Sequence, residues 1–221
     1  MEIVLIIAYF LPILFLMAFI GHEGKKFLVW LLWGFLASIP VIILYPVVTH
    51  ALPALWYPYL TVSPVLEEFF KALPIVISAV IGIKNSDRNL LACAMASGIG
   101  FSIVETWLVI DPAMLQLTLG NVMSVLARSF STSLMHGCTT GIIGYGIVIT
   151  RNFDRGALPA LVFGFYTLAV TTHAMYNLLS VYYGEMGIII DIIFPVVFFF
   201  FLLACYHVDL PGLFKKRSLA W

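Results

Sequence analysis

The chain has 221 residues, of which 62% are hydrophobic and only 10% are charged. Soluble domains carry about 25% charged residues and disordered chains are poor in apolar ones, so this composition excludes both an ordinary cytosolic globule and a disordered chain. Lys and Arg number 11 and so do Asp and Glu, and this balance gives no indication of a nucleic-acid partner.

Seven apolar runs are long enough to cross a bilayer, because a membrane-spanning helix needs roughly 17–25 predominantly apolar residues. The N-terminus, MEIVLIIAYF, lacks the basic residues and the cleavage site of a signal peptide, so we predict that the first run is a retained span. The runs lie near 3–21, 27–49, 64–83, 90–110, 121–149, 157–182 and 186–206. Backbone groups in lipid must pair internally, so the predicted fold class is all-α, a polytopic transmembrane helical bundle of about seven spans.

Loop charges predict how these spans are oriented. The loops after the first, third, fifth and seventh spans contain basic residues, whereas the N-terminus and the other three loops contain none. The basic loop residues are Lys25, Lys26, Lys84, Arg88, Arg151, Arg155, Lys215, Lys216 and Arg217. By the positive-inside rule, the N-terminus is expected outside and the C-terminus in the cytoplasm.

We expect a single integral-membrane domain over residues 1–221, because no internal repeat or low-complexity stretch marks a second unit. Residues 207–221 form a basic cytoplasmic tail, and the uncharged segment 51–63, rich in Pro, Trp and Tyr, suits the outer membrane interface. The three cysteines lie inside apolar runs without metal-binding spacing, which favours packing roles over a disulfide or a zinc knuckle.

Ionisable side chains inside the spans are the candidate functional residues, because a charge at bilayer depth costs at least about 2.5–3.5 kcal/mol. They are Glu67, Glu68 and Lys71 in the third span, Glu105 in the fourth, Arg128 and His136 in the fifth, and His173 in the sixth. Asn177 follows His173 by one turn and shares its helix face. The alternatives are an interfacial salt bridge for the third span and hydrogen-bonded core roles for the histidines.

Helix arithmetic places most of these groups in one layer of the membrane. At 1.5 Å per residue, the glutamates of the third and fourth spans and both histidines lie about 5–10 Å beneath the outer surface. Their helices run in opposite directions, and polar residues with scattered structural roles would have no reason to agree in depth. We therefore predict a single site that water enters from outside.

Two kinds of hydrolytic chemistry suit histidines and glutamates that face one another. They could bind a metal ion, zinc being the most plausible from the ligand types, while one glutamate activates water. They could also act without metal, with a glutamate as the base and His or Asn hydrogen bonds to the oxyanion. A proton-coupled transporter is a further alternative, because buried Glu, Lys and His also build proton relays.

Four segments, in order along the chain, resemble the motifs of the PrsW family of intramembrane proteases, which belongs to one superfamily with the CAAX prenyl endopeptidases. EEFFK at 67–71 matches the EExxK motif, and GFSIVE at 100–105 resembles the FxxxE helix. The region of His136 resembles the third segment, and HAMYN at 173–177 resembles the final His-x-x-x-Asn/Asp. The likeness covers about residues 60–182, and Thr106 departs from the Asn that commonly follows the family's Glu.

The resemblance implies an intramembrane endopeptidase and roles for individual residues. Glu67 and Glu68 would include the base that activates water. Glu105, His136 and His173 would complete the catalytic or metal shell, and Asn177 would position the substrate or the oxyanion. The zinc ligands expected from this match are Glu68, Glu105, His136 and His173.

The same resemblance implies that the substrate is a membrane-anchored protein, such as an anti-sigma factor, cleaved near the outer face of the membrane. We expect a multi-pass protein of a prokaryotic cell membrane, in contact with lipid and with no nucleic-acid partner. The alternatives are a proton-coupled transporter and a catalytically silent relative that binds membrane proteins.

Overall fold

A computed structural model describes residues 24–54, 57–81, 87–109, 118–150, 156, 158–183 and 187–207. The regular elements in these ranges are α-helices, and no strand occurs among them. The helices are α2 (Gly24–Ala51), α3 (Pro58–Val80), α4 (Asp87–Val109), α5 (Leu119–Thr150), α6 (Leu158–Tyr183) and α7 (Gly187–His207). The all-α prediction is confirmed for this part of the chain, while the first predicted span, 3–21, and residues 208–221 lie outside the described residues.

Each of the six later apolar runs coincides with one helix, with one clear difference at the start of α3. Segment 51–63 is predicted as an interfacial connection, but its second half belongs to α3. Tyr57 has a left-handed backbone, with φ of 52°, and Pro58 follows at the first helical position. Proline has the backbone angle of a helix and needs no hydrogen-bond acceptor there, so the helix begins six residues earlier than hydropathy indicates.

Three helical segments are long and apolar enough to cross a membrane by composition alone, within the part of the chain that the structure describes. They are Phe27–Ala51, Asn89–Leu108 and Leu158–Tyr182. Helix α3 differs because Glu67, Glu68 and Lys71 lie at its middle, and α5 differs because it is rich in Ser, Thr and Gly. These two helices hold much of the predicted site.

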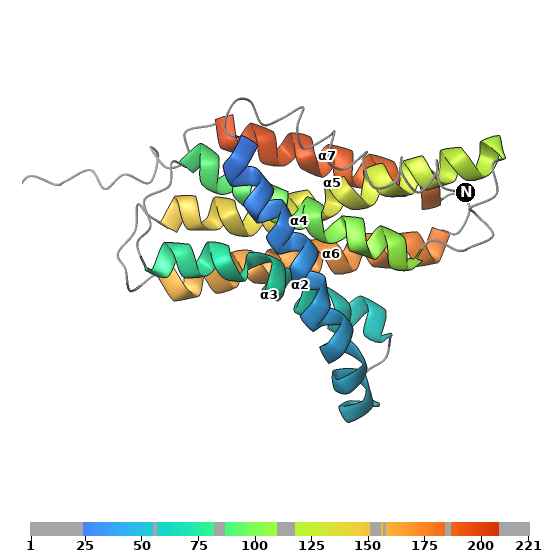
Figure 1. Ribbon diagram of the computed structural model, residues 1–221, viewed down its shortest axis with the longest axis horizontal. Coiled ribbons are helices and arrows are strands. Elements are labelled where there is room, and N and C mark those ends of the chain that lie inside the picture. The colour runs from blue at the N-terminus through green and yellow to red at the C-terminus, as the bar shows by residue number, and fades with distance from the viewer. Residues whose placement is uncertain are drawn as a thin grey trace, which may run out of the picture.

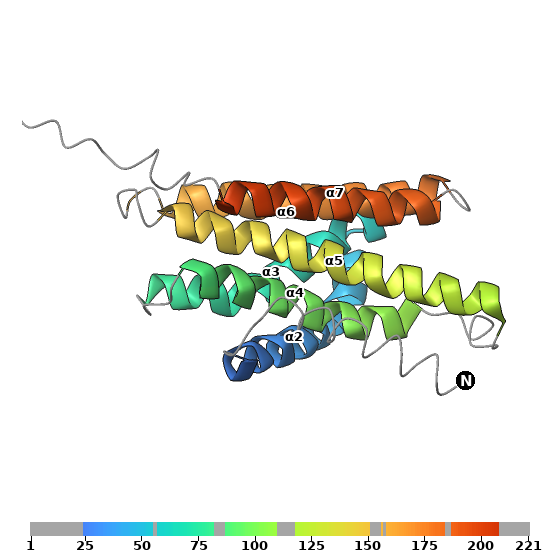
Figure 2. The ribbon, with the colours of Figure 1, turned by 90° about the horizontal axis from the view of Figure 1, so that it is seen from above.

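Helix α5 is the centre of the bundle. It packs against α4, α6 and α7, and it lies between α4 and the α6–α7 pair when the bundle is seen from above (Figure 2). Every residue from 131 to 150 is buried. Small side chains allow such close packing on all sides, and helix interfaces in membranes are typically built from them.

Helix α2 crosses the other helices steeply, and its C-terminal half projects from the bundle beside the first turns of α3 (Figure 1). Glycine makes the crossing with α4 close: a Cβ on Gly34 would lie 1.8 Å from the carbonyl oxygen of Ser97, and one on Gly100 would lie 2.0 Å from that of Leu31. Any side chain at these positions would separate the two helices.

Two prolines inside helices leave carbonyl groups that neighbouring helices satisfy. Pro74 has no N–H to give to the carbonyl of Phe70, and the indole Nε1 of Trp33 donates to that oxygen at 3.0 Å. Pro195 likewise leaves the carbonyl of Asp191 without its helical partner, and the Ser131 hydroxyl donates to it. Each proline therefore creates a polar tie between helices, from α2 to α3 and from α5 to α7.

Replacing Gly98 by alanine should destabilise the bundle. A Cβ at this position of α4 would lie 2.0 Å from the carbonyl oxygen of His136 on α5. The clash is between a Cβ fixed on one helix backbone and the backbone of the other helix, so no side-chain rotation can relieve it. We expect Gly98→Ala to lower the free energy of unfolding by about 1–3 kcal/mol, the usual cost of overpacking. Gly164→Ala is the matched control, because nothing lies within 4 Å of a Cβ there.

The control should change stability in the opposite direction, since alanine in an open helical position stabilises by about 0.4–1 kcal/mol. Unfolding of both purified variants in detergent micelles measures the difference. Equal stability of the two variants would contradict the close backbone contact between α4 and α5.

Candidate active site

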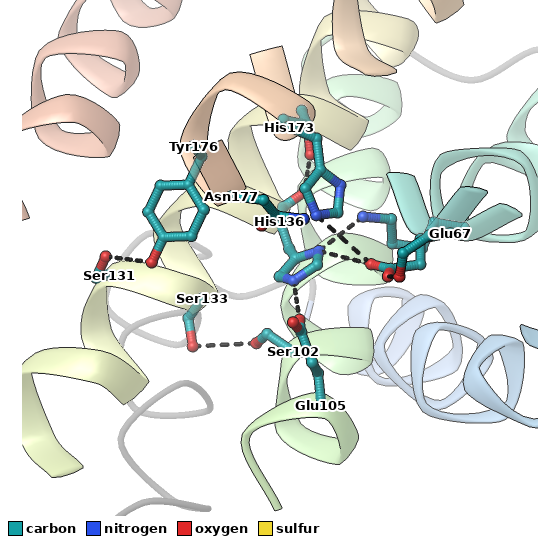
Figure 3. A network of polar contacts seen from close by, with 12 residues as sticks. Glu67, Ser102, Glu105, Ser131, Ser133, His136, His173, Tyr176 and Asn177 are labelled. Carbon is teal, nitrogen blue, oxygen red and sulfur yellow. Dashed lines mark hydrogen bonds and ion pairs between the residues drawn. The ribbon is translucent and has the colours of Figure 1, made fainter. Parts of the chain in front are cut away.

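The side chains singled out by the sequence motifs converge at one place inside the bundle (Figure 3). Helix α3 contributes Glu67, Glu68 and Lys71, α4 contributes Glu105, α5 contributes His136, and α6 contributes His173 and Asn177. All of them are buried except Glu105, whose side chain is 16% exposed. Groups that are far apart in the sequence but agree in predicted depth are therefore in contact.

Glu68 is surrounded by hydrogen-bond donors. Its Oε1 accepts from Lys71 Nζ at 2.6 Å, from the Thr139 hydroxyl at 2.8 Å and from His173 Nδ1 at 2.8 Å. Its Oε2 accepts from the Thr140 hydroxyl at 3.3 Å. With no exposed surface and donors on both oxygens, this carboxylate is occupied by structural contacts.

Glu67, the preceding residue, has a different environment. Its Oε1 accepts a hydrogen bond from Ser63, one turn earlier on α3, whereas its Oε2 is buried and has no hydrogen-bond partner. That free oxygen lies 3.7 Å from His173 Nε2 and 3.9 Å from His136 Nδ1. Glu67 therefore presents one unpaired carboxylate oxygen to both histidines.

Both imidazole rings are held by a carboxylate on the side away from Glu67. His173 Nδ1 bonds to Glu68, so a neutral ring carries its proton on Nδ1 and leaves the lone pair on Nε2, which has no partner. His136 Nε2 pairs with Glu105, and its Nδ1 lies 2.7 Å from Lys71 Nζ. The two rings meet edge to face with centroids 4.9 Å apart.

The Lys71 ammonium is the cation of this cluster. It lies between Glu68 and His136, and 5.1 Å from the centroid of the Phe101 ring, over its face. Phe101 belongs to the same FxxxE segment as Glu105, so the two motif residues contact the site from one face of α4. A lysine with no exposed surface is tolerated here because carboxylate, imidazole and aromatic ring all favour its charge.

Three atoms are placed so that they could hold a metal ion. One ligand atom each from Glu67, His136 and His173 lies within 4.8 Å of the others. Two histidines and a carboxylate are a common ligand set of catalytic zinc sites. Carboxylates on the far ring nitrogens, here Glu68 and Glu105, are the usual partners of metal-binding histidines. The donor set therefore fits zinc.

This grouping differs from the zinc ligands expected from the sequence, which are Glu68, Glu105, His136 and His173. Both histidines recur, but Glu67 stands in the group instead of Glu68 and Glu105. The physical reason is that these two carboxylates already bond to the histidines and are turned away from the shared space. The identity of the metal ligands stays a prediction.

Unpaired polar atoms are concentrated at this site. In the described part of the chain, four buried side-chain atoms have no hydrogen-bond partner: Glu67 Oε2, His173 Nε2, Asn177 Oδ1 and Thr106 Oγ1. Three belong to predicted site residues, and Thr106 is the position that departs from the family pattern. Because buried polar groups are nearly always paired in proteins, such a concentration indicates a place where a ligand or water binds.

The remaining predicted groups lie around this centre. Asn177 Nδ2 is 3.4 Å from the backbone oxygen of Tyr59, which ties α6 to the first turn of α3. Arg128, two turns before His136 on α5, is exposed and close enough to Glu105 to interact with it electrostatically. Arg128 therefore lies at the exposed edge of the site, on the side of Glu105.

Several polar residues of the site region were missed by the sequence reasoning. Thr139 and Thr140 follow His136 by three and four residues, so helical spacing from the histidine could have identified them. Asp191 lies within the run 186–206 but was not counted among the intramembrane charges. Its carboxylate accepts from Ser180 at 2.6 Å, and its carbonyl and the Tyr176 hydroxyl both bond to Ser131.

Comparison with known proteins extends the sequence likeness. The family model described as PrsW family intramembrane metalloprotease matches residues 23–205, which includes α2 and most of α7 as well as the four motifs. Searches of curated proteins and of solved structures found no match to the chain.

Proposed function

The chain belongs to the PrsW family of intramembrane metalloproteases, and on that basis we propose that it hydrolyses a peptide bond of membrane-anchored proteins near the outer face of the membrane. The observation that carries the proposal is the pair of buried, unpaired acceptors, Glu67 Oε2 and His173 Nε2, 3.7 Å apart. An anti-sigma factor of a prokaryotic cell membrane is the kind of substrate we propose.

The proposed topology has seven spans, with the N-terminus outside and the C-terminus in the cytoplasm. This topology is supported by the loop charges, because every basic loop residue lies in an alternate loop along the chain. In this orientation the site would lie beside the outward-facing end of α4, where Glu105 is, and beside the middle of α3. Water could then reach Glu67 from the extracytoplasmic side.

In the metal-free form of the site, hydrolysis would begin with a water molecule that donates hydrogen bonds to Glu67 Oε2 and His173 Nε2. Glu67 takes a proton from this water while the water oxygen forms a bond to the carbonyl carbon of the substrate. We propose that the Asn177 amide donates to the resulting oxyanion with the N–H that is not directed at the Tyr59 carbonyl. When the C–N bond breaks, the proton held on Glu67 passes to the leaving amine.

Zinc is the metal we propose, and Glu67, His136 and His173 are the residues that would hold it. With the ion present, His173 Nε2 and a Glu67 oxygen would bind the metal in place of the direct hydrogen bonds to water. When bound, zinc would polarise the substrate carbonyl and acidify water. Glu68 and Glu105 would orient the two imidazoles through their far nitrogens. For His136 Nδ1 to coordinate, Lys71 must give up its 2.7 Å contact with that nitrogen.

Metal analysis of the purified protein tests this assignment. We expect about one zinc ion per chain, lost in His173→Gln and strongly reduced in Glu68→Gln, because the first removes a ligand and the second its orienting carboxylate. A chelator should abolish cleavage, and added zinc should restore it. Cleavage that persists in metal-free protein would overturn the zinc assignment and leave the glutamate base in place.

The protease proposal itself is tested by mapping new protein N-termini in membranes. Cells that express the chain are compared with cells that express Glu67→Gln, which keeps the shape of the site but lacks the base. We expect termini close to the outer ends of single-span segments only with the intact chain. If the two sets of termini are identical, the chain is not an active protease.

A further inference from the structure

We propose that Thr139 is a positioning residue, which acts through Glu68 to fix the tautomer and orientation of His173. The inference rests on the proposed function, in which the lone pair of His173 Nε2 faces the reacting water. It concerns the interior of α5, where Thr139 has no exposed surface. The family resemblance assigns no role to this residue.

A chain of three hydrogen-bonded side chains carries the inference. The Thr139 hydroxyl donates to Glu68 Oε1 at 2.8 Å, and the same oxygen accepts from His173 Nδ1 at 2.8 Å. These residues come from α5, α3 and α6, and all three are fully buried. The hydroxyl therefore joins the central helix to the two helices that carry the carboxylate and the imidazole.

Thr139 and its neighbour Thr140 differ from most threonines of the described helices, because their hydroxyls donate to a side chain on another helix. A helical threonine usually bonds back to a carbonyl of its own helix. Those that do so here are Thr49, Thr61, Thr150, Thr167, Thr171 and Thr172. Thr139 has such a carbonyl, that of His136, at 3.2 Å, but the carboxylate is closer. The hydroxyl is therefore directed toward Glu68.

Glu68 needs a tie from outside α3 to hold its position. Lys71 bonds to it from the same helix, at spacing i to i+3, and so cannot fix α3 relative to α6. The other donor from α5, Thr140, reaches Oε2 at 3.3 Å, a longer contact on the oxygen that does not face His173. Thr139 is therefore the α5 residue that donates to Glu68 Oε1, the oxygen that also accepts the hydrogen bond from His173 Nδ1.

The position of Glu68 decides which nitrogen of His173 carries the proton. An ionised carboxylate only accepts hydrogen bonds, so a neutral ring beside it is protonated at Nδ1 and keeps a lone pair at Nε2. If Glu68 turns away, the tautomer with Nε2–H becomes accessible. That tautomer would place a donor, instead of an acceptor, against the water beside Glu67.

The test uses NMR of nitrogen-labelled histidine in the purified full chain, with metal removed by a chelator. The signal of His173 among the five histidines is identified by its loss in His173→Gln. We expect Thr139→Val to change the ratio of the two His173 tautomers by about tenfold, the effect of one lost hydrogen bond. Thr139→Ser, which retains the hydroxyl, should restore the original ratio.

Thr150→Val is the matched control, because Thr150 is a buried threonine of the same helix whose hydroxyl bonds to Ile147 O at 2.8 Å. It should leave the His173 signal unchanged. Thr139→Ala provides a second hydroxyl-free variant if Thr139→Val does not fold. An unchanged tautomer ratio in a folded variant without the hydroxyl, or failure of serine to restore it, would overturn the proposal.

This measurement needs no substrate, so it separates the inference from the proposed function. If the chain proves inactive as a protease, the tautomer shift still reports whether Thr139 positions His173. Where cleavage is measurable, Thr139→Val should lower kcat about tenfold with little change in KM, since the hydroxyl does not contact the substrate.

Discussion

Replacing Glu67 by glutamine should reduce the rate of peptide-bond hydrolysis by about 10²–10⁴-fold, the usual contribution of a general base. The amide has nearly the shape of the carboxylate and can still accept from Ser63 through its oxygen. It cannot take a proton from water. Binding of a single-span substrate should therefore persist while its cleavage is lost, as measured by cleavage and co-purification in one assay.

Asp191→Asn is the matched control for Glu67→Gln. It also removes the charge of a carboxylate in an apolar helix, but Asp191 lies on α7 and accepts a hydrogen bond from Ser180. We expect this variant to retain at least about half of the wild-type rate, because the asparagine oxygen can still accept the hydrogen bond from Ser180. Equal loss in both variants would contradict a specific role for Glu67 and point to damage of the bundle.

Replacing Lys71 by methionine should destabilise the protein more than any other single change in the cluster. Both Lys71 and Glu68 are fully buried and their charged atoms are 2.6 Å apart. Removing one partner of such a pair leaves an uncompensated buried charge, which costs about 3–5 kcal/mol. Methionine has a similar length to lysine, so the loss of stability reflects the missing charge and its hydrogen bonds more than a change in packing.

A double-mutant cycle separates the ion pair from the surrounding contacts. Lys71→Met and Glu68→Gln are measured singly and together by unfolding in detergent micelles. We expect the double variant to lose clearly less stability than the sum of the single variants, because neither charge remains alone. Strict additivity would show that the two groups do not depend on each other.

Much of the fold follows from the cost of polar groups in lipid. Long apolar runs predict the helices, and the few charges inside them predict the site, because each charge needs a compensating partner in the bundle. Agreement in depth further predicts that Glu105 and the two histidines, from three helices, face one another. The all-helical architecture and the contact of these residues could therefore be predicted without coordinates.

The different environments of Glu67 and Glu68 could not be predicted in this way. The two residues are chemically identical and adjacent, and they differ by about 100° around the helix axis. Only the packing of α5 and α6 decides that Glu68 meets Thr139 and His173 while Glu67 keeps a free oxygen. Such contacts depend on how helices are rotated against each other, which hydropathy does not record.

The steep crossing of α2 and the ties at Pro74 and Pro195 are also tertiary features. A proline in a helix predicts an unsatisfied carbonyl four residues earlier, but not which neighbour fills it. Here the donors are Trp33, which lies 37 residues from Phe70, and Ser131, which lies 60 residues from Asp191. Asp191 itself had a readable signal, a lone acid in an apolar run, that was overlooked.

The complete burial of α5 between residues 131 and 150 has a consequence for how the protein is made. Helices α4, α6 and α7 cover this stretch, so it is fully surrounded only after the later helices have been inserted. His136 lies on this helix, and its partners come from α3, α4 and α6. A nascent chain therefore cannot assemble the cluster until α6 has been inserted.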